Sequence, residues 1–257
     1  MKEKTSKAPT KKAPFGVSIN GGSKKVTKNT MKSFFKVKKA PRINPLNSEE
    51  MLKEPQKKFG GLNLETVLKM KLPDRIAPDL DFLFIGINPS PQAAYHGHHY
   101  VGNNHMWKCL FLSGLIDEKL TASDDVLLPE KYKIGFTTIV ERTTPRMTDL
   151  KPVEIVEGGK DLLRKIQELK PKIAVFNGKL IYEKFAKKVL KMKKVKVVLG
   201  RQQDVEVPGS DTRIYAMPST SALCQTYPTA ETKAPFFEEA KEWLAELKDG
   251  SVHKKDD

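Results

Sequence analysis

Two short apolar runs that end abruptly at polar loops constrain the fold of this chain more than any other feature. The run at 82–87 stops at Asn88, and the run at 214–217 stops in a loop that carries Ser219. Short apolar runs bounded by turn residues are typical of buried strands in a parallel sheet. In open α/β sheets, ligands bind at the carboxyl ends of such strands. We therefore expect Asn88 and Ser219 to lie on two sides of one cleft.

Helical patterns alternate with these runs along the chain. A third apolar run, 173–176, ends at Asn177. Further strands are expected at 136–140 and 195–199, and residues 92–101 indicate a polar loop. Apolar residues recur at helical spacing in the segments 64–72, 106–115, 155–169, 180–189 and 236–247. This alternation predicts an α/β fold with three layers, α/β/α, around a short, mostly parallel central sheet.

Positive charge is concentrated at the amino-terminal end. Residues 1–50 hold 13 Lys and Arg against 3 Glu, which accounts for +10 of the net charge of +15. Blocks of like charge resist collapse and often act as interaction tails. We expect a basic, largely disordered arm over 1–58, a globular domain over 59–248 and a polar tail over 249–257. The natural partner is a polyanion, nucleic acid rather than a membrane, since no stretch approaches the ~20 apolar residues of a membrane span.

The cysteines and histidines do not form a recognisable metal motif. Cys109 and Cys224 lie far apart in the sequence, which suggests packing roles in a reducing compartment. Four histidines lie near one another in the sequence: His96, His98, His99 and His105. Their spacing is looser than that of structural zinc sites, so we expect neither a metal nor an organic cofactor. A histidine-dependent metallohydrolase stays as a weaker alternative.

The two strand-end motifs, GINP at 86–89 and MPSTSA at 217–222, resemble the two motifs of the uracil-DNA glycosylase superfamily. The resemblance is closest to its thymine-DNA glycosylase and mismatch-specific uracil-DNA glycosylase branch, and it runs from about residue 80 to residue 228. Intervening stretches agree in order: 93–95, 97–100, 107–111, 135–137, 140–145 and 175–179. A single GINP would be weak evidence, whereas the whole series is strong. It implies a glycosylase catalytic domain over 59–248.

The resemblance implies hydrolysis of the bond between base and sugar of thymine or uracil mispaired with guanine, with oxidised cytosine as a further substrate, leaving an abasic site. Such an enzyme must take the base out of the helical stack, which costs least at a mispair. In the family, the residue that matches Asn88 orients the attacking water. An amide does not take up a proton near neutral pH, so the rate should follow the quality of the base as a leaving group. The alternative role for Asn88 is a turn residue before Pro89 that caps the next helix.

A set of residues is expected to line the substrate pocket, Asn177 because it ends a third strand at the same edge and the others by the same resemblance: Ile87, Ala93, His99, Tyr100, Thr138, Thr144 and Asn177. Thr138 departs from the thymine enzyme, which carries Asn there, and this changes how the base can be recognised. Asn177 also has a plain alternative, a turn with Gly178.

The second motif is expected to contact DNA through five consecutive residues: Ser219, Thr220, Ser221, Ala222 and Leu223. Its hydroxyls and amides suit a phosphate, although the same residues also cap helices. Leu223 stands where the thymine enzyme has Arg. An apolar residue there matches the bacterial relative, in which it wedges into the gap left by the flipped base. The alternative is that Leu223 packs in the core.

The basic arm contains an apolar island at Met31, Phe34 and Phe35. Its spacing resembles the peptide that docks on sliding clamps, and the alternative is a nonspecific DNA-binding arm with incidental aromatics. Taken together, we expect a monomeric DNA-repair glycosylase that acts on G·T or G·U mismatches in double-stranded DNA, located in the nucleus if the source is eukaryotic. The rival is a non-catalytic DNA-binding or clamp-associated scaffold on a glycosylase fold.

Overall fold

A computed structural model describes residues 52–193, 195 and 197–250. Most of the expected basic arm, including Met31, Phe34 and Phe35, lies outside these residues, as does the tail from 251 onward. Those expectations therefore stay predictions.

The centre of the fold is a five-stranded sheet with the strand order β2-β1-β3-β5-β4. The strands are parallel within the order β2-β1-β3-β5, whereas β4 runs antiparallel to β5. The strands are β1 (Phe82–Gly86), β2 (Ile134–Thr138), β3 (Ile173–Asn177), β4 (Gly200–Arg201) and β5 (Arg213–Met217). This confirms the expected α/β fold with a mostly parallel sheet between helices. The carboxyl ends of β1, β3 and β5 share one edge, as the polar residues after the three apolar runs had indicated.

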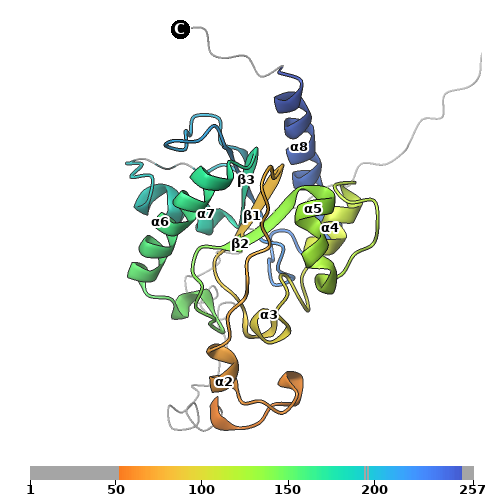
Figure 1. Cartoon of the computed structure of the whole chain (residues 1–257), viewed down its shortest axis with the longest axis vertical. Coiled ribbons are helices and arrows are strands. Elements are labelled where there is room, and N and C mark those ends of the chain that lie inside the picture. Colours follow the sequence, from red (N-terminus) through yellow and green to blue (C-terminus); the bar gives the residue numbers. More distant parts are fainter. Residues whose placement is uncertain (1–51, 194, 196, 251–257) are drawn as a thin grey trace, which may run out of the picture. The chain divides into compact units, whose positions relative to one another are not determined.

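Helices cover both faces of the sheet because successive side chains of each strand point to opposite faces. Leu83 and Ile85 belong to one core and Phe82 and Phe84 to the other. Figure 1 shows α6 and α7 on one side of the sheet and α4, α5 and α8 on the other. These helices are α4 (Met106–Leu112), α5 (Leu128–Tyr132), α6 (Pro152–Leu169), α7 (Lys179–Lys188) and α8 (Ala230–Lys248). Within the described ranges, no helix has the length and apolarity that crossing a bilayer requires.

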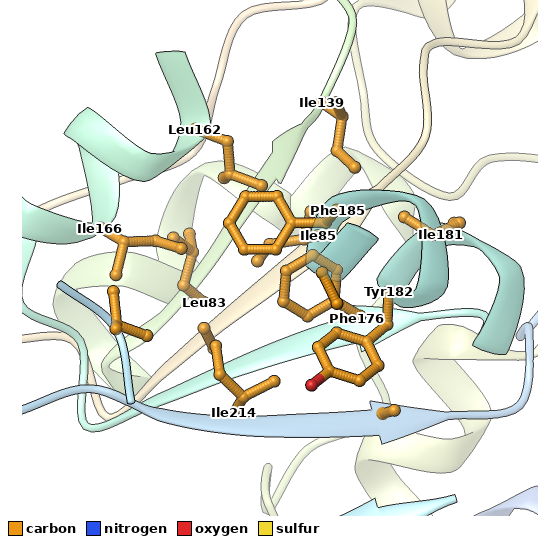
Figure 2. Packing of buried hydrophobic residues seen from close by; sticks show 14 of the residues in the cluster. Leu83, Ile85, Ile139, Leu162, Ile166, Phe176, Ile181, Tyr182, Phe185 and Ile214 are labelled. Carbon is orange, nitrogen blue, oxygen red and sulfur yellow. The ribbon is translucent and has the colours of Figure 1, made fainter. Parts of the chain in front are cut away.

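The core beneath α6 and α7 is built from apolar residues of alternate strand positions (Figure 2). The ring of Phe176 on β3 contacts Tyr182 and Phe185 of α7, with ring centroids 5.3 and 4.9 Å apart. All three side chains are completely buried. Burial of this kind contributes about 1.5–3 kcal/mol for each large apolar side chain. It fixes α7 directly behind the strand that ends at Asn177.

Residues 92–101 were expected to form a loop, but the first part of this segment is helical. Helix α3 covers Pro91–His96. The Ser90 side chain accepts a hydrogen bond from the Ala93 backbone at 3.2 Å, and the helix ends at Gly97 with φ of 69°. A serine cap, a proline in the first turn and a closing glycine are the usual signals of a short helix. The histidines of the segment had obscured this pattern.

The expected strand at 195–199 was also wrong. Residues 195 and 197–199 are irregular, and the strand β4 that follows has only two residues and runs antiparallel. Val197 is buried and Val195 packs against the core under α6 and α7. Val195 and Val197 are therefore explained by packing against the core rather than by a place in the parallel sheet, whereas Val198 is exposed. The remaining elements are η1 (Lys57–Phe59), α2 (Leu64–Leu68), η2 (Ala122–Leu127) and η3 (Met147–Asp149).

Candidate active site

A cavity of about 190 Å³ lies at the carboxyl ends of β1 and β3 and at the start of the loop after β5. Pockets for drug-sized ligands measure about 300–1,000 Å³, so this cavity suits a smaller group. The residues expected in the pocket or the DNA-binding loop that line it are Ile87, Asn88, Ala93, His99, Tyr100, Thr138, Asn177 and Ser219. A larger cavity of about 890 Å³ lies at the opposite edge of the sheet, beside Lys170 and Arg213, and contains none of these residues.

The side-chain amide of Asn88 has a defined orientation. Its Nδ2 donates to the backbone oxygen of Arg142 at 2.9 Å and to Oγ1 of Thr144 at 2.7 Å, and lies 3.2 Å from the Pro89 oxygen. A backbone oxygen can only accept, so the atom facing Arg142 must be the nitrogen. The amide oxygen Oδ1 is therefore directed away from this wall. An oxygen held in this way can accept a hydrogen bond from a water molecule in the cavity.

The two groups that hold Asn88 are themselves fixed. Oγ1 of Thr144 donates to the Arg146 oxygen at 2.8 Å, which leaves it as an acceptor for Asn88. The guanidinium of Arg142 binds both oxygens of Glu154 in the first turn of α6, at 2.6 and 2.9 Å. The hydrogen bonds from Arg142 lower the pKa of Glu154 to about 2, so the pair is ionised at neutral pH. Thr144 was expected to line the cavity, but it is buried behind Asn88 and positions it.

His99 forms part of the opposite wall as a neutral imidazole. Its Nε2 donates to the Pro73 oxygen at 3.0 Å, which leaves Nδ1 without a proton. Burial lowers the pKa of His99, because the charged form would lose its hydration. The backbone nitrogen of His99 donates to Asp125, which is completely buried and also pairs with Arg75 and His98, each at 2.9 Å. Sequence reasoning missed Asp125, because an aspartate in a polar stretch carries no signal of burial.

Tyr100 and Thr138 surround Gly86 at the end of β1. The Tyr100 backbone is left-handed, with φ of 55°, and its ring packs edge-on against Phe136 at 5.0 Å. Burial raises the pKa of Tyr100 to about 12, opposed by the neighbouring Asn177 amide, so the phenol stays protonated. Thr138 donates its hydroxyl to the Val140 oxygen at 3.1 Å, and its methyl group faces Gly86. The hydroxyl proton of Thr138 is thus used by the backbone.

Asn177 joins the end of β3 to the loop that follows β5. Its Nδ2 donates to Oγ1 of Thr220, and its Oδ1 accepts from the Thr220 backbone nitrogen, both at 2.8 Å. Thr220 was expected to grip a phosphate, but its side chain is fully buried and its hydroxyl faces inward. The two hydrogen bonds to Asn177 explain this orientation, because they use both the hydroxyl and the backbone N–H of Thr220. They also fix the loop on the end of the sheet.

The rest of this loop is folded on itself and ends in an exposed leucine. The backbone N–H of Ser221 donates a hydrogen bond to Oγ of Ser219. The hydroxyl oxygen of Ser221 accepts a hydrogen bond from the backbone N–H of Leu223. The Ala222 nitrogen donates to the Asn103 oxygen at 3.3 Å. Leu223 is 85% exposed, so the alternative that it packs in the core is wrong. Of these five residues, Ser219 is the one that lines the cavity.

The side chains of the four histidines singled out in the sequence have separate partners. His98 pairs with Asp125, His99 with the Pro73 oxygen, and Nδ1 of His105 lies 2.9 Å from Nζ of Lys233. His96 packs edge-on against the ring of Tyr95. Across the part of the chain that the structure describes, no three His, Cys, Asp or Glu side chains gather as metal ligands would.

Residues 73–245 match the family model described as the uracil DNA glycosylase superfamily. The matched segment is well over half of the chain and contains every residue of the cavity named above as well as the loop with Leu223. It also contains the whole stretch, 80–228, over which the motifs resemble that family.

Proposed function

The chain belongs to the uracil DNA glycosylase superfamily, whose members hydrolyse the N-glycosidic bond of uracil-type lesions in DNA, and we propose that this member removes thymine or uracil mispaired with guanine. The proposal places it in the thymine-DNA and mismatch-specific uracil-DNA glycosylase branch. The motif series between Asn88 and Leu223 supports this branch, and the cavity is small enough to select a single base over a larger ligand.

The orientation of the Asn88 amide is the observation that carries the proposal. With both donors engaged by Arg142 and Thr144, its oxygen accepts a hydrogen bond from a water and aims the water oxygen at the sugar carbon. The bond between sugar and base breaks with its electron pair leaving on the base, and the water oxygen bonds to the sugar carbon. The amide cannot take the proton, which passes to solvent. The base leaves with negative charge, and hydrogen-bond donors fixed in advance around it lower the barrier to this step.

Replacing Asn88 with Ala tests the mechanism. Base release from a G·U or G·T duplex should be abolished while duplex binding survives, because the side chain orients water without contributing to the DNA contact. Base release is measured by abasic-site formation, and duplex binding by a gel-shift titration. Asn103→Ala is the matched control, since the Asn103 side chain is exposed and only its backbone holds the loop. Normal turnover by Asn88→Ala would remove Asn88 from the mechanism, and no abasic site from the natural chain would favour the non-catalytic scaffold.

Leu223 is proposed to wedge into the space that the everted base vacates. Its high exposure and its place in the same loop as Ser219, which lines the cavity, support this role, because apolar wedges that unstack bases must project from the surface. Leu223→Ala should slow processing of a stable G·T pair more than processing of uracil in a single strand, which needs no unstacking. Equal slowing of both substrates would contradict the wedge.

The preferred base is proposed to follow leaving-group quality. Thymine should be released slowly, and uracil or a cytosine oxidised at the 5-position faster, since no strong general base or acid assists the step. A panel of single-turnover rates over these bases opposite guanine measures the order. The basic arm is proposed to add salt-dependent affinity for duplex DNA, and Met31, Phe34 and Phe35 to dock on a sliding clamp in the nucleus.

A further inference from the structure

A completely buried lysine lies beneath the loop that presents Leu223. Lys233, in the first turns of α8, has no exposed surface and is among the largest fully buried side chains. Lysines are almost never fully buried unless they are paired with an opposite charge. No carboxylate forms a salt bridge with Lys233 in the described part of the chain. Its burial therefore calls for an explanation other than charge pairing.

The Lys233 ammonium is held by two acceptors on the cleft side. Nζ lies 2.9 Å from the backbone oxygen of Ser221 and 2.9 Å from Nδ1 of His105. An ammonium can only donate, so Nδ1 of His105 must be unprotonated. Burial and the charge of Lys233 both lower the pKa of His105, which keeps the imidazole neutral at pH 7. The backbone nitrogen of His105 in turn donates to the Thr220 oxygen at 2.9 Å.

Three successive residues of the loop are thus fixed from outside it. Asn177 holds Thr220, Lys233 holds Ser221, and the Asn103 oxygen holds Ala222. Leu223 is the next residue, and its side chain is exposed. A wedge must withstand the resistance of the base stack, which amounts to a few kcal/mol per step. Its backbone therefore has to be positioned before DNA binds.

We propose that Lys233 is a positioning residue that sets the Leu223 loop for base eversion. The proposal rests on the wedge role proposed for Leu223. Lys233 lines neither the cavity nor the exposed surface, so it acts on the reaction through the loop, directly at the Ser221 oxygen and through His105, whose backbone holds Thr220. Its side chain connects helix α8 to this loop.

A double-mutant cycle between Lys233→Met and Leu223→Ala tests the proposal in the full-length chain. Methionine keeps most of the buried stem and loses both hydrogen bonds. Lys233→Met alone should lower the single-turnover rate on a G·T duplex by about tenfold to a hundredfold, the range for a displaced active-site element. Uracil in a single strand should be processed within about twofold of the natural rate. In the Leu223→Ala background, Lys233→Met should add less than about twofold on G·T, because residues that act through one another are not additive.

Lys241→Met is the matched control. Lys241 lies on the same helix and also donates to two backbone oxygens, those of Ser113 at 3.4 Å and Gly114 at 2.9 Å, but on a segment away from the cleft. Its replacement should leave the ratio of the G·T rate to the single-strand rate unchanged. Fully additive effects of Lys233→Met and Leu223→Ala, or an equal loss on both substrates, would overturn the proposal.

Two further measurements keep the test decisive if Lys233→Met does not fold. His105→Ala removes one acceptor of the ammonium while keeping the backbone bond to Thr220, and it should lower the same rate ratio in the same direction. In the Asn88→Ala background, 2-aminopurine next to the mismatch reports base eversion without hydrolysis. Eversion that His105→Ala leaves unchanged would overturn the positioning role. A chain that everts no base and releases none would instead refute the proposed function itself.

Discussion

The amide of Asn88 depends on two oxygen acceptors for its direction, and each acceptor is fixed by a different part of the chain. Arg142 is held on the first turn of α6 through Glu154, and Thr144 is held by the Arg146 oxygen. Oδ1 must face the cavity to orient a water. Because the two acceptors hold Nδ2 on the other side, the loss of either one should allow the amide to rotate out of this position.

Thr144→Val removes one of these acceptors at nearly constant volume. The rate constant of base release should fall roughly tenfold, since a small misplacement of a positioning group is costly, while the affinity for duplex is unchanged. Single-turnover kinetics and a binding titration separate the two quantities. Thr143→Val is the control, because Thr143 is equally buried and donates to the Met70 oxygen instead of contacting Asn88. A similar loss with Thr143→Val would show that the effect comes from general destabilisation.

The sequence allowed some residues of the cleft to be located but not others. Asn88, Asn177 and Ser219 follow apolar runs, and parallel strands bring their carboxyl ends to one edge, so their proximity followed from the pattern. Asp125 and Lys233 carry no such signal. A charged residue in a polar stretch or on a helix is normally solvated, and only the packing of segments distant in sequence buries these two.

At the scale of whole elements, helix α6 connects the core to the wall that holds Asn88. Gly158 faces the segment after β2 so closely that a Cβ atom there would lie 2.0 Å from the Ile139 oxygen. The helix therefore packs backbone to backbone, and Glu154, one turn earlier, meets Arg142 in the right place. A side chain at 158 would push α6 away from residues 139 and 140.

Gly158→Ala should destabilise the fold by about 1–3 kcal/mol, as overpacking of a core does, and should also slow base release. Urea unfolding and single-turnover kinetics measure the two effects. Gly159→Ala is the comparison variant: its Cβ would lie 2.4 Å from Cγ2 of Val189 and 3.7 Å from Cδ2 of Phe185, so it crowds side chains rather than backbone. The gain in helix propensity of up to about 1 kcal/mol offsets part of that crowding, and we expect a smaller loss of stability than with Gly158→Ala. If both variants lost equal stability, the close backbone approach of α6 would not explain the result.

Element prediction succeeded where periodicity and burial agree. The strands β1, β3 and β5 and the helices α6, α7 and α8 came from clear apolar patterns. The short helix α3 and the two-residue strand β4 did not, because caps and local packing, rather than periodicity, define them. Val195 and Val197 belong to a stretch with the composition of a strand but pack against the core as irregular chain.

At the scale of the whole molecule, the neutral burial of His99 links folding to pH. The unfolded chain takes up a proton on this histidine near its ordinary pKa of 6.5, whereas burial lowers the pKa in the folded state. Its contribution to stability is therefore complete above pH 6.5 and is lost as the pH falls from 6.5 toward the lower folded value. Each unit by which burial lowers the pKa corresponds to about 1.4 kcal/mol.

The thermal unfolding midpoint of the natural chain should therefore fall more between pH 7.5 and pH 5.5 than that of His99→Gln. Glutamine stays neutral and keeps a donor for the Pro73 oxygen. Scanning calorimetry at a series of pH values measures the difference. His105, whose pKa is also lowered, contributes to the loss of stability that His99→Gln still shows at low pH. Equal losses in the two chains would contradict a neutral, buried His99.

Neither outer strand of the sheet exposes a long run of unpaired backbone groups within the described residues. The outer strand β2 is bridged at its centre by Arg75, which exchanges two backbone hydrogen bonds with Phe136, and the other edge ends in the two-residue strand β4. A run of unpaired backbone groups is the template on which a second chain adds a strand. Because neither edge of the described sheet offers a long run of this kind, a second chain finds little to pair with there, which disfavours edge-to-edge aggregation.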